Sequence, residues 1–411
     1  MEKVVLEEIS LSSTELGTRV DYKYKAPEIL QKYIKGEPLF VEFPCDMKSV
    51  PLSILSIPFV GIMATVTMLL NVEIHVPVLE KGFMDCMAKL SKVYAKLYPD
   101  SELKIDVFAD NVAKSKICSG GGTSNALFFT GGVDATSALI GLLEKRPTLV
   151  NIWGGDLRLT DEDSHRELAQ YLDTITEYLD LDYCFIKTNA REMFCEDELG
   201  YLTSNHVGKF NEYGWWATIA HSLSMASTVI PWTYKKEIRS IYLGSTHAKK
   251  EISYDANNVE LLDAISNEIC SIRIADGDLV RNDKVTKIVR WKQETKAPIQ
   301  LKVCWRRVAG KNCSSCEKCY RTILNILSNH GDPNEFGFEV DANVLLGIKK
   351  YLETHRVGIA FWKPIQDAFL AEKEYWRTKS EISWILDVKF NSMKTLLPRV
   401  QRKLLQWFKR R

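Results

Sequence analysis

The sequence lacks an excess of either charge. Its 411 residues contain 54 Lys and Arg against 53 Asp and Glu, which leaves a net charge of +1. A protein that binds nucleic acid usually carries a basic excess, so the composition gives no strong nucleic-acid signal. Internal repeats and low-complexity tracts are also missing, and apolar residues make up 45% of the chain. We therefore expect an ordinary globular protein of two or three domains.

Signals for export are missing and signals for membrane insertion are weak. Residues 1–8 contain neither a basic segment nor a long apolar stretch, so we expect no signal peptide. Residues 49–72 carry no charge and approach the length of a membrane span. Pro51 and Pro58 interrupt this run, and a buried strand or a pair of core helices explains the same composition. We predict a cytoplasmic protein with this run in its core; a membrane helix is the alternative.

The two ends of the chain offer no catalytic motif. Residues 1–118 mix strand-like and helix-like segments and are predicted to form an accessory α/β domain, which could dock a partner protein. Residues 331–411 look mainly helical, and residues 394–411 carry seven Lys and Arg and no acid. This amphipathic tail indicates either a packed terminal helix with a solvated basic face or a helix that binds a membrane surface or a partner.

Between these ends, strands and helices alternate. The glycine-rich residues 119–124 are interpreted as a linker, after which strands are expected at 126–129, 149–153, 183–187 and 240–243. Helices are expected at 135–143, 161–179 and 215–227. The pattern predicts a Rossmann-like parallel sheet with helices on both faces, in a domain covering 119–300. Ligands of such sheets bind at the carboxyl ends of the strands.

The sharpest local signal follows the first of these strands. The residues are Thr130, Gly131, Gly132, Val133, Asp134, Ala135, Thr136 and Ser137, and they join a strand to a helix. Two glycines permit a tight turn, and the helix N-terminus favours an anion, so the loop can hold a pyrophosphate. The hydroxyls could add donors, and Asp134 could cap the helix or help position Mg²⁺. A plain Gly-Gly turn is the alternative, since neither the phosphate-loop Lys-Ser/Thr nor GxGxxG is present.

This loop resembles the PP-loop of the ATP pyrophosphatase superfamily, usually Ser-Gly-Gly-x-Asp-Ser-Ser/Thr. Members cleave ATP between the α and β phosphates and adenylate a carboxylate or carbonyl. Thr130 stands in place of the first serine and Ala135 in place of the second. The resemblance implies that Ile152 and Trp153 approach the adenosine and that Gly244 leaves room for it.

Four of the ten cysteines gather in one segment. Cys304, Cys313, Cys316 and Cys319 form a C-x8-C-x2-C-x2-C pattern that suits a structural tetrahedral zinc site, in a knuckle at 301–330. An iron–sulfur cluster and disulfides are the alternatives. The six scattered cysteines are interpreted as small core residues.

Together, the loop and the cysteines resemble the zinc-containing 7-cyano-7-deazaguanine synthases of the queuosine pathway. The resemblance covers residues 125–330, and it implies ATP, Mg²⁺ and Zn²⁺ as cofactors. These enzymes adenylate a deazaguanine carboxylate and transfer it to ammonia, giving an amide and then a nitrile. Residues 1–118 and 331–411 have no counterpart in them. The family's Tyr-Pro-Asp substrate loop is not recognisable in residues 247–255.

We therefore predict an ATP-dependent carbon–nitrogen ligase. Its substrates would be a small-molecule carboxylate and an amine, either ammonia or an amine of a protein, and it could form a homo-oligomer. Relatives of these synthases occur in antiviral defence operons, which suggests that the product could serve antiviral defence. Asp134, Lys249 and Lys284 are the predicted catalytic residues; Lys250 and Arg281 are further candidate cations, and His247 could bind substrate. The alternatives are an amidotransferase or thiolation enzyme acting on a sugar or tRNA, and a scaffold that binds a nucleotide without turnover.

Overall fold

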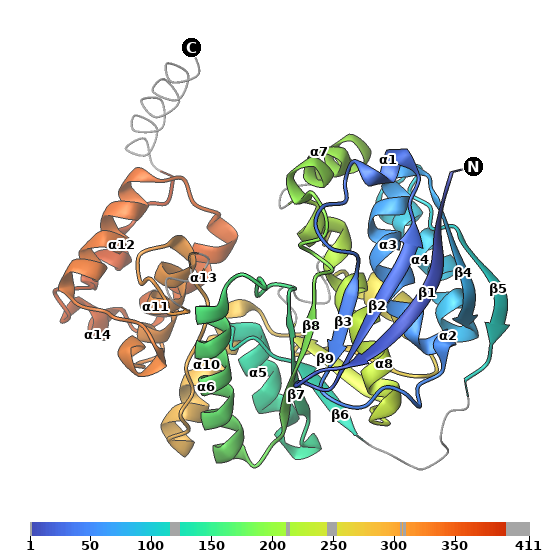
Figure 1. The fold of residues 1–411 in the computed structure, drawn as a ribbon. Helices are drawn as coiled ribbons and strands as arrows, with labels where there is room; N and C mark the ends of the chain where they lie inside the picture. Colours follow the sequence, from blue (N-terminus) through green and yellow to red (C-terminus); the bar gives the residue numbers. More distant parts are fainter. Residues whose placement is uncertain are drawn as a thin grey trace. The chain divides into compact units, whose positions relative to one another are not determined.

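Ten strands form one sheet that is flanked by helices (Figure 1). The structure is a computed structural model that describes residues 2–115, 124–210, 214–244, 253–304, 306 and 310–391. The strand order is β10-β9-β6-β7-β8-β3-β2-β1-β4-β5. The strands are β1 (Lys3–Ser13), β2 (Thr18–Lys25), β3 (Phe40–Phe43), β4 (Glu73–Glu80), β5 (Val107–Ala113), β6 (Asn125–Phe128), β7 (Thr148–Trp153), β8 (Tyr183–Thr188), β9 (Ser240–Gly244) and β10 (Ser271–Ala275).

The sheet is mostly parallel, and the expectation of an α/β fold is confirmed. Strands β10, β9, β6, β7 and β8 pair in parallel, as do β1, β4 and β5. The strands expected within 119–300 pair in parallel with one another, and the antiparallel pairs involve strands of the N-terminal region, where β8, β3, β2 and β1 meet at the centre of the sheet. A Gly17 turn closes β1 and β2 into a hairpin, which brings these strands together without a crossover helix.

Strands from both sides of residue 118 belong to this one sheet. Val41 of β3 pairs with Thr188 of β8, so the N-terminal region shares backbone hydrogen bonds with the region after the linker. The chain divides into two compact units along a different line. The first contains Met1–Phe129, Gly141–His165 and Asp180–Asp278, and the second contains Thr130–Ile140, Arg166–Leu179 and Leu279–Arg411.

The first unit encloses the uncharged run in its core. Residues 52–70 form α2 (Leu52–Leu55) and α3 (Ile57–Leu70), and they are long and apolar enough to cross a membrane, yet 94% of this segment is buried. Gly61 of α3 permits close packing on Ser227 of α8 (His221–Lys235), where an added Cβ would lie 2.4 Å from the serine Cβ. The predicted core position of this run is confirmed, and of the two forms expected for it, a buried strand or a pair of helices, the structure contains the pair of helices.

The helices around the sheet agree with most of the expected positions. The others in the first unit are α1 (Glu28–Gln31), α4 (Lys81–Leu97), α7 (Glu196–Val207), the π-helix η3 (Trp216–Ala220), α8 (His221–Lys235) and α9 (Val259–Ile265). Two helices, α5 (Val133–Leu142) and α6 (Glu162–Leu179), each contain a boundary between the units, after Ile140 and after His165. The second unit adds α10 (Arg281–Thr295), α11 (Glu317–Leu327), α12 (Ala342–Thr354), α13 (Ile359–Ala371) and α14 (Lys373–Arg377) (Figure 1).

Candidate functional site

The predicted nucleotide loop joins a buried strand directly to a helix. At its start, the Phe129 N–H donates to the Val150 carbonyl oxygen at 2.9 Å, and the Asn151 side-chain amide donates to the Phe129 carbonyl oxygen at 3.0 Å. The helix α5 then begins at Val133. These bonds fix where the loop leaves the sheet. The strand-to-helix placement that an anion site requires is therefore present.

The two glycines of the loop have different structural roles. Gly131 has a φ of +72°, in the left-handed region, and its carbonyl oxygen accepts a 2.8 Å hydrogen bond from the Lys302 N–H. A Cβ on Gly131 would also lie 3.3 Å from the Tyr171 ring. Among the residues that the structure describes, the atom nearest to a Cβ on Gly132 would be the Thr130 hydroxyl oxygen at 3.5 Å, an ordinary contact. The turn therefore requires Gly131, whereas Gly132 keeps the surface of the loop uncovered.

Asp134, in the first turn of α5, binds two cations of α10. Its Oδ2 accepts from an Arg281 guanidinium nitrogen at 2.7 Å, and its Oδ1 lies 3.2 Å from the Lys284 Nζ. The Lys284 side chain is 0% exposed, while that of Arg281 is 30% exposed. Asp134 therefore positions positive charge beside the loop, and Arg281 is the cation that solvent and ligands can reach. Lys284 is fully buried and contacts the Asp134 carboxylate from inside the protein.

The loop hydroxyls do not all share one face. Thr136 and Ser137 are 0% exposed, and the Thr136 Oγ1 has no hydrogen-bond partner among the residues that the structure describes. Thr130, Gly132 and Asp134 are partly exposed. The accessible face of the loop thus consists of these three residues, and the other two hydroxyls lie beneath it.

The residues expected near adenosine belong to the first unit. Ile152 is 2% exposed at the end of β7, and Gly244 ends β9. The Trp153 ring stacks on His165, with centroids 3.9 Å apart, and the Lys187 Nζ lies 4.8 Å from the Trp153 centroid. Trp153 therefore already has a partner ring and a cation.

Several expected residues cannot be placed. Lys249, Lys250 and His247 lie outside the described residues, as do most of the predicted linker and the basic tail at 394–411. The roles given to them stay predictions.

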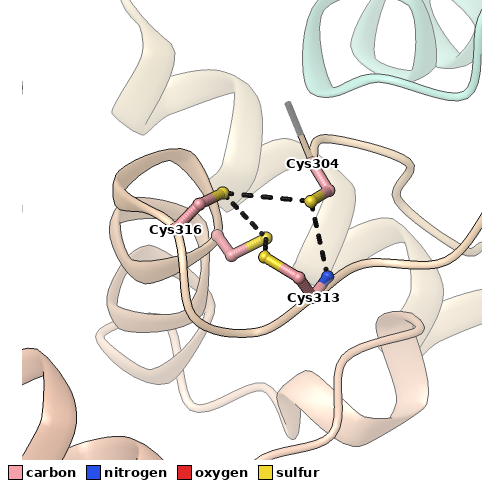
Figure 2. Close-up of side chains that lie close together, drawn as sticks. Cys304, Cys313 and Cys316 are labelled. Carbon is pink, nitrogen blue, oxygen red and sulfur yellow. Dashed lines mark hydrogen bonds between the residues drawn. The ribbon is translucent and has the colours of Figure 1, made fainter. Parts of the chain in front are cut away.

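The four cysteines converge in the second unit, as their spacing predicts. Their sulfur atoms all lie within 4.8 Å of one another. The Sγ–Sγ distances are 3.9 Å for Cys304–Cys316, 3.5 Å for Cys316–Cys319 and 4.0 Å for Cys313–Cys319. Figure 2 shows Cys304, Cys313 and Cys316 pointing toward one another. Sulfurs 2.3 Å from a tetrahedral zinc are about 3.8 Å apart, so the cluster could hold a metal such as zinc.

The surroundings of the cluster act differently on its individual thiols. The backbone N–H groups of Arg306 and Cys313 donate to the Cys304 Sγ at 3.2 and 3.4 Å. The hydrogen bond with Cys316, followed by burial, raises the pKa of the Cys319 thiol well above its ordinary value. Burial raises the pKa of the Cys313 thiol, but hydrogen bonds from Ser315 outweigh it and leave that pKa below its ordinary value. A divalent cation bound by all four cysteines would offset the repulsion among their thiolates.

Sequence reasoning missed two residues that connect the loop with the cysteine cluster. Lys302 bonds Gly131 through its backbone, as described above, and it stands two residues before Cys304. The Asn312 Oδ1 accepts from the Val303 and Cys304 N–H groups at 3.1 and 3.2 Å. The only sequence signal was their position beside the first two cysteines.

Comparison with known proteins found no match: no family model, no curated protein and no solved structure matches the chain.

Proposed function

We propose that this protein is an ATP-dependent ligase resembling 7-cyano-7-deazaguanine synthases. It would adenylate a deazaguanine-type carboxylate, release pyrophosphate and transfer the acyl group to an amine. The observation that carries the proposal is the Gly131–Gly132 turn between β6 and α5, with Asp134 holding Arg281 beside it. This combination supplies backbone donors, a helix N-terminus and an accessible cation at one loop.

The residues of the loop suit the charge that develops during adenylation. A carboxylate oxygen attacks the α-phosphorus of ATP, and the bond from that phosphorus to the bridging oxygen of pyrophosphate breaks. The departing pyrophosphate gains negative charge, which the loop N–H groups and Arg281 would stabilise. Lys284, fully buried against Asp134, would keep the Asp134 carboxylate in place. When bound, Mg²⁺ would neutralise the phosphates, and Asp134 is the carboxylate of the loop that would hold it.

The amine would complete the reaction on the acyl adenylate. Its nitrogen attacks the acyl carbon, AMP leaves with the electron pair of the broken C–O bond, and the ammonium proton passes to solvent. Ammonia could be the amine in this step, and so could an amine of a macromolecule if the protein serves antiviral defence. The acceptor is therefore a question for product analysis.

The cysteine cluster would hold zinc in a structural role. All four ligand positions of a tetrahedral ion would be filled by protein, which leaves none open for substrate. Such a site stabilises the fold around it, and Lys302 connects that fold to Gly131.

Two alternative functions have specific support. Ala135, which lacks the family's hydroxyl, favours a scaffold that binds a nucleotide without turnover. The unrecognisable substrate loop also favours the scaffold, whereas a PP-loop amidotransferase or thiolation enzyme acting on a sugar or tRNA would share only the nucleotide loop with these synthases.

Mass spectrometry tests the proposal. The full-length protein is incubated with ATP, Mg²⁺ and 7-carboxy-7-deazaguanine, with and without ammonia, and AMP and new deazaguanine species are followed. Arg281→Ala should reduce AMP formation about 100-fold, by analogy with loss of one transition-state donor. Arg290→Ala is the matched control, since Arg290 is 79% exposed on the same helix. ATP binding without AMP would favour the scaffold, and AMP only with other carboxylates would overturn the deazaguanine assignment.

A further inference from the structure

The sheet of the first unit ends at an exposed strand, β5. It is the last strand in the sheet order, and in the part of the chain that the structure describes no strand pairs with its outer side (Figure 1). Its seven residues contain no proline or glycine, and they pair with β4 at one constant offset, without a bulge. Phe108 and Val112 on this strand are 48% and 47% exposed. Proteins usually protect such an edge, because it can pair with a strand of another molecule.

The backbone of β5 presents hydrogen-bonding groups on its outer side. The Ile74 N–H of β4 donates to the Asp106 carbonyl oxygen at 2.8 Å, so the backbone groups of Asp106 face β4. Successive residues of a strand direct their N–H and carbonyl groups to alternate sides. The residues whose groups point away from β4 are therefore Val107, Ala109, Asn111 and Ala113. A strand from a second molecule could bond to these groups.

The side chains of this segment are complementary to themselves. Alternation along the strand places Asp110, Val112 and Lys114 on one face, and all three are exposed. We consider two copies of the strand paired antiparallel, with Val112 of one copy opposite Val112 of the other. Asp110 of each copy then lies opposite Lys114 of the other copy. Opposite charges at facing positions stabilise a strand pair, so this register has two favourable charge pairs around an apolar centre.

Registers displaced toward the start of β5 lose this match. The outward backbone groups occur at every second residue, so the register can move only in steps that keep these groups facing each other. The first such step places Asp110 opposite Val112, which leaves the carboxylate without an opposite charge. The second places the two Asp110 side chains opposite each other, which is repulsive. Among the residues that the structure describes, the register centred on Val112 is therefore the one that pairs every charge.

We propose that two copies of this chain associate edge to edge through β5, antiparallel, with a two-fold axis at Val112. Asn111 of each copy exchanges backbone hydrogen bonds with Ala113 of the other, and the two ten-stranded sheets become one. The interface contains one strand of each copy, which is small for a stable dimer, so the dimer dissociates in the micromolar range. This inference goes beyond the proposed ligase activity and does not depend on it.

Sedimentation velocity of the full-length protein between about 1 and 100 µM tests the association. The wild type should change from monomer to dimer within this range. Asp110→Lys should weaken dimerisation at least about tenfold, because both opposite-charge pairs become like-charge pairs. Lys114→Asp added to the same chain reverses both charges and should restore the dimer. Asp263→Lys is the matched control, since it makes the same charge change at an exposed position of α9.

Cysteine cross-linking locates the axis. In the proposed register the two copies of Val112 occupy a non-hydrogen-bonded pair, whose Cα atoms are about 4.5 Å apart, within the range of a disulfide. Val112→Cys should therefore form a covalent dimer under mild oxidation with copper phenanthroline. Asp110→Cys should not, because its two copies would be about 13 Å apart, four residues along the strands. The wild type, oxidised in the same way, accounts for the native cysteines.

Each outcome supports the inference or overturns it. A wild type that stays monomeric up to about 100 µM overturns it, even if that protein binds a strand of some other molecule. A dimer that Asp110→Lys does not weaken uses another surface and also overturns it. Cross-linking of Val112→Cys at no more than the level of Asp110→Cys overturns the register, whether or not Asp110→Lys folds. AMP formation tests the ligase separately, so failure of one proposal leaves the other intact.

Discussion

The backbone N–H of Lys302 donates to the Gly131 carbonyl oxygen at 2.8 Å, and Lys302 stands two residues before the first cysteine of the four-cysteine cluster. The Asn312 side chain ties the same segment down, accepting from Val303 and Cys304 and donating to the Leu301 carbonyl oxygen at 2.6 Å. The conformation of the proposed nucleotide loop is therefore supported by residues next to the cysteine cluster. We therefore expect loss of a metal from the cluster to weaken ATP binding at the loop.

The first prediction concerns that dependence. Cys316→Ser should lower bound zinc from about one ion per chain to near zero, because a structural site needs all four thiolates. It should also lower the thermal midpoint and weaken ATP binding. Elemental analysis, thermal unfolding and ATP titration measure these effects. Cys195→Ser, which lies outside the cluster, is the control; full zinc content in Cys316→Ser would contradict the prediction, and iron in place of zinc would favour the iron–sulfur alternative.

The two loop glycines should respond differently to alanine. Gly131→Ala should destabilise the protein by about 1–2 kcal/mol, because its φ of +72° is unfavourable for a side chain. Gly132→Ala should leave stability nearly unchanged yet weaken ATP binding, because its methyl group would cover the loop without an internal clash. Chemical denaturation and ATP titration separate the two effects. Normal ATP affinity in Gly132→Ala would argue against phosphate binding at this loop.

Removal of Asp134 should cost more than removal of its buried partner. Asp134→Asn removes one charged partner of the fully buried Lys284 and should destabilise the protein by about 1–3 kcal/mol. Lys284→Met removes the buried charge and leaves Asp134 paired with Arg281, so its loss should be smaller. Urea unfolding of both variants checks the order. A reversed order would mean that Asp134 contributes little to holding Lys284.

Stability should depend on pH through Asp156 and His221. Burial lowers the pKa of His221, but Asp156 outweighs it and leaves that pKa raised above 6.5. Burial raises the pKa of Asp156, but His221, Trp216 and Arg191 outweigh it and leave that pKa lowered below 3.8.

The directions of these two pKa shifts determine how the unfolding free energy changes with pH. The stability gained from His221 is fully present below pH 6.5 and is lost as the pH rises through its raised pKa. The stability gained from Asp156 is present above pH 3.8 and is lost as the pH falls toward its lowered pKa. The unfolding free energy of wild type should therefore exceed that of His221→Asn most between these pH values, by about 1–2 kcal/mol. Urea titrations across the range test this, and a constant difference up to alkaline pH would contradict it.

The close contact between α3 and α8 can be tested with two substitutions, the second of which should relieve the clash that the first creates. Gly61→Ala places a methyl group against Ser227 and should destabilise the protein by about 1–3 kcal/mol. Ser227→Gly in the same chain removes the obstructing side chain. The double variant should be more stable than the sum of the single effects by about 1 kcal/mol. Strict additivity in thermal unfolding would mean that α3 and α8 do not pack this closely.

Local patterns in the sequence predicted much of the fold. The strand expected at 149–153 is observed as Thr148–Trp153, and that expected at 183–187 as Tyr183–Thr188. Their apolar runs and flanking turns are properties of neighbouring residues, which the sequence displays directly. The expected helix at 215–227 differs more, because it begins with a π-helix and continues to Lys235. A single turn of π-helix leaves no periodic signal in the sequence that distinguishes it from a turn of α-helix.

The sequence by itself determined the strand–loop–helix order around Gly131 and the closeness of the four cysteines, because each depends on residues near one another in the chain. Only the tertiary structure decided that Arg281 binds Asp134 across 147 positions, that antiparallel strands occupy the centre of the sheet, and that Asp156 meets Trp216 and His221. Such partners are chosen by the path of the backbone and by packing. Many exposed carboxylates and cations are equivalent in sequence until the fold brings particular ones within hydrogen-bond distance.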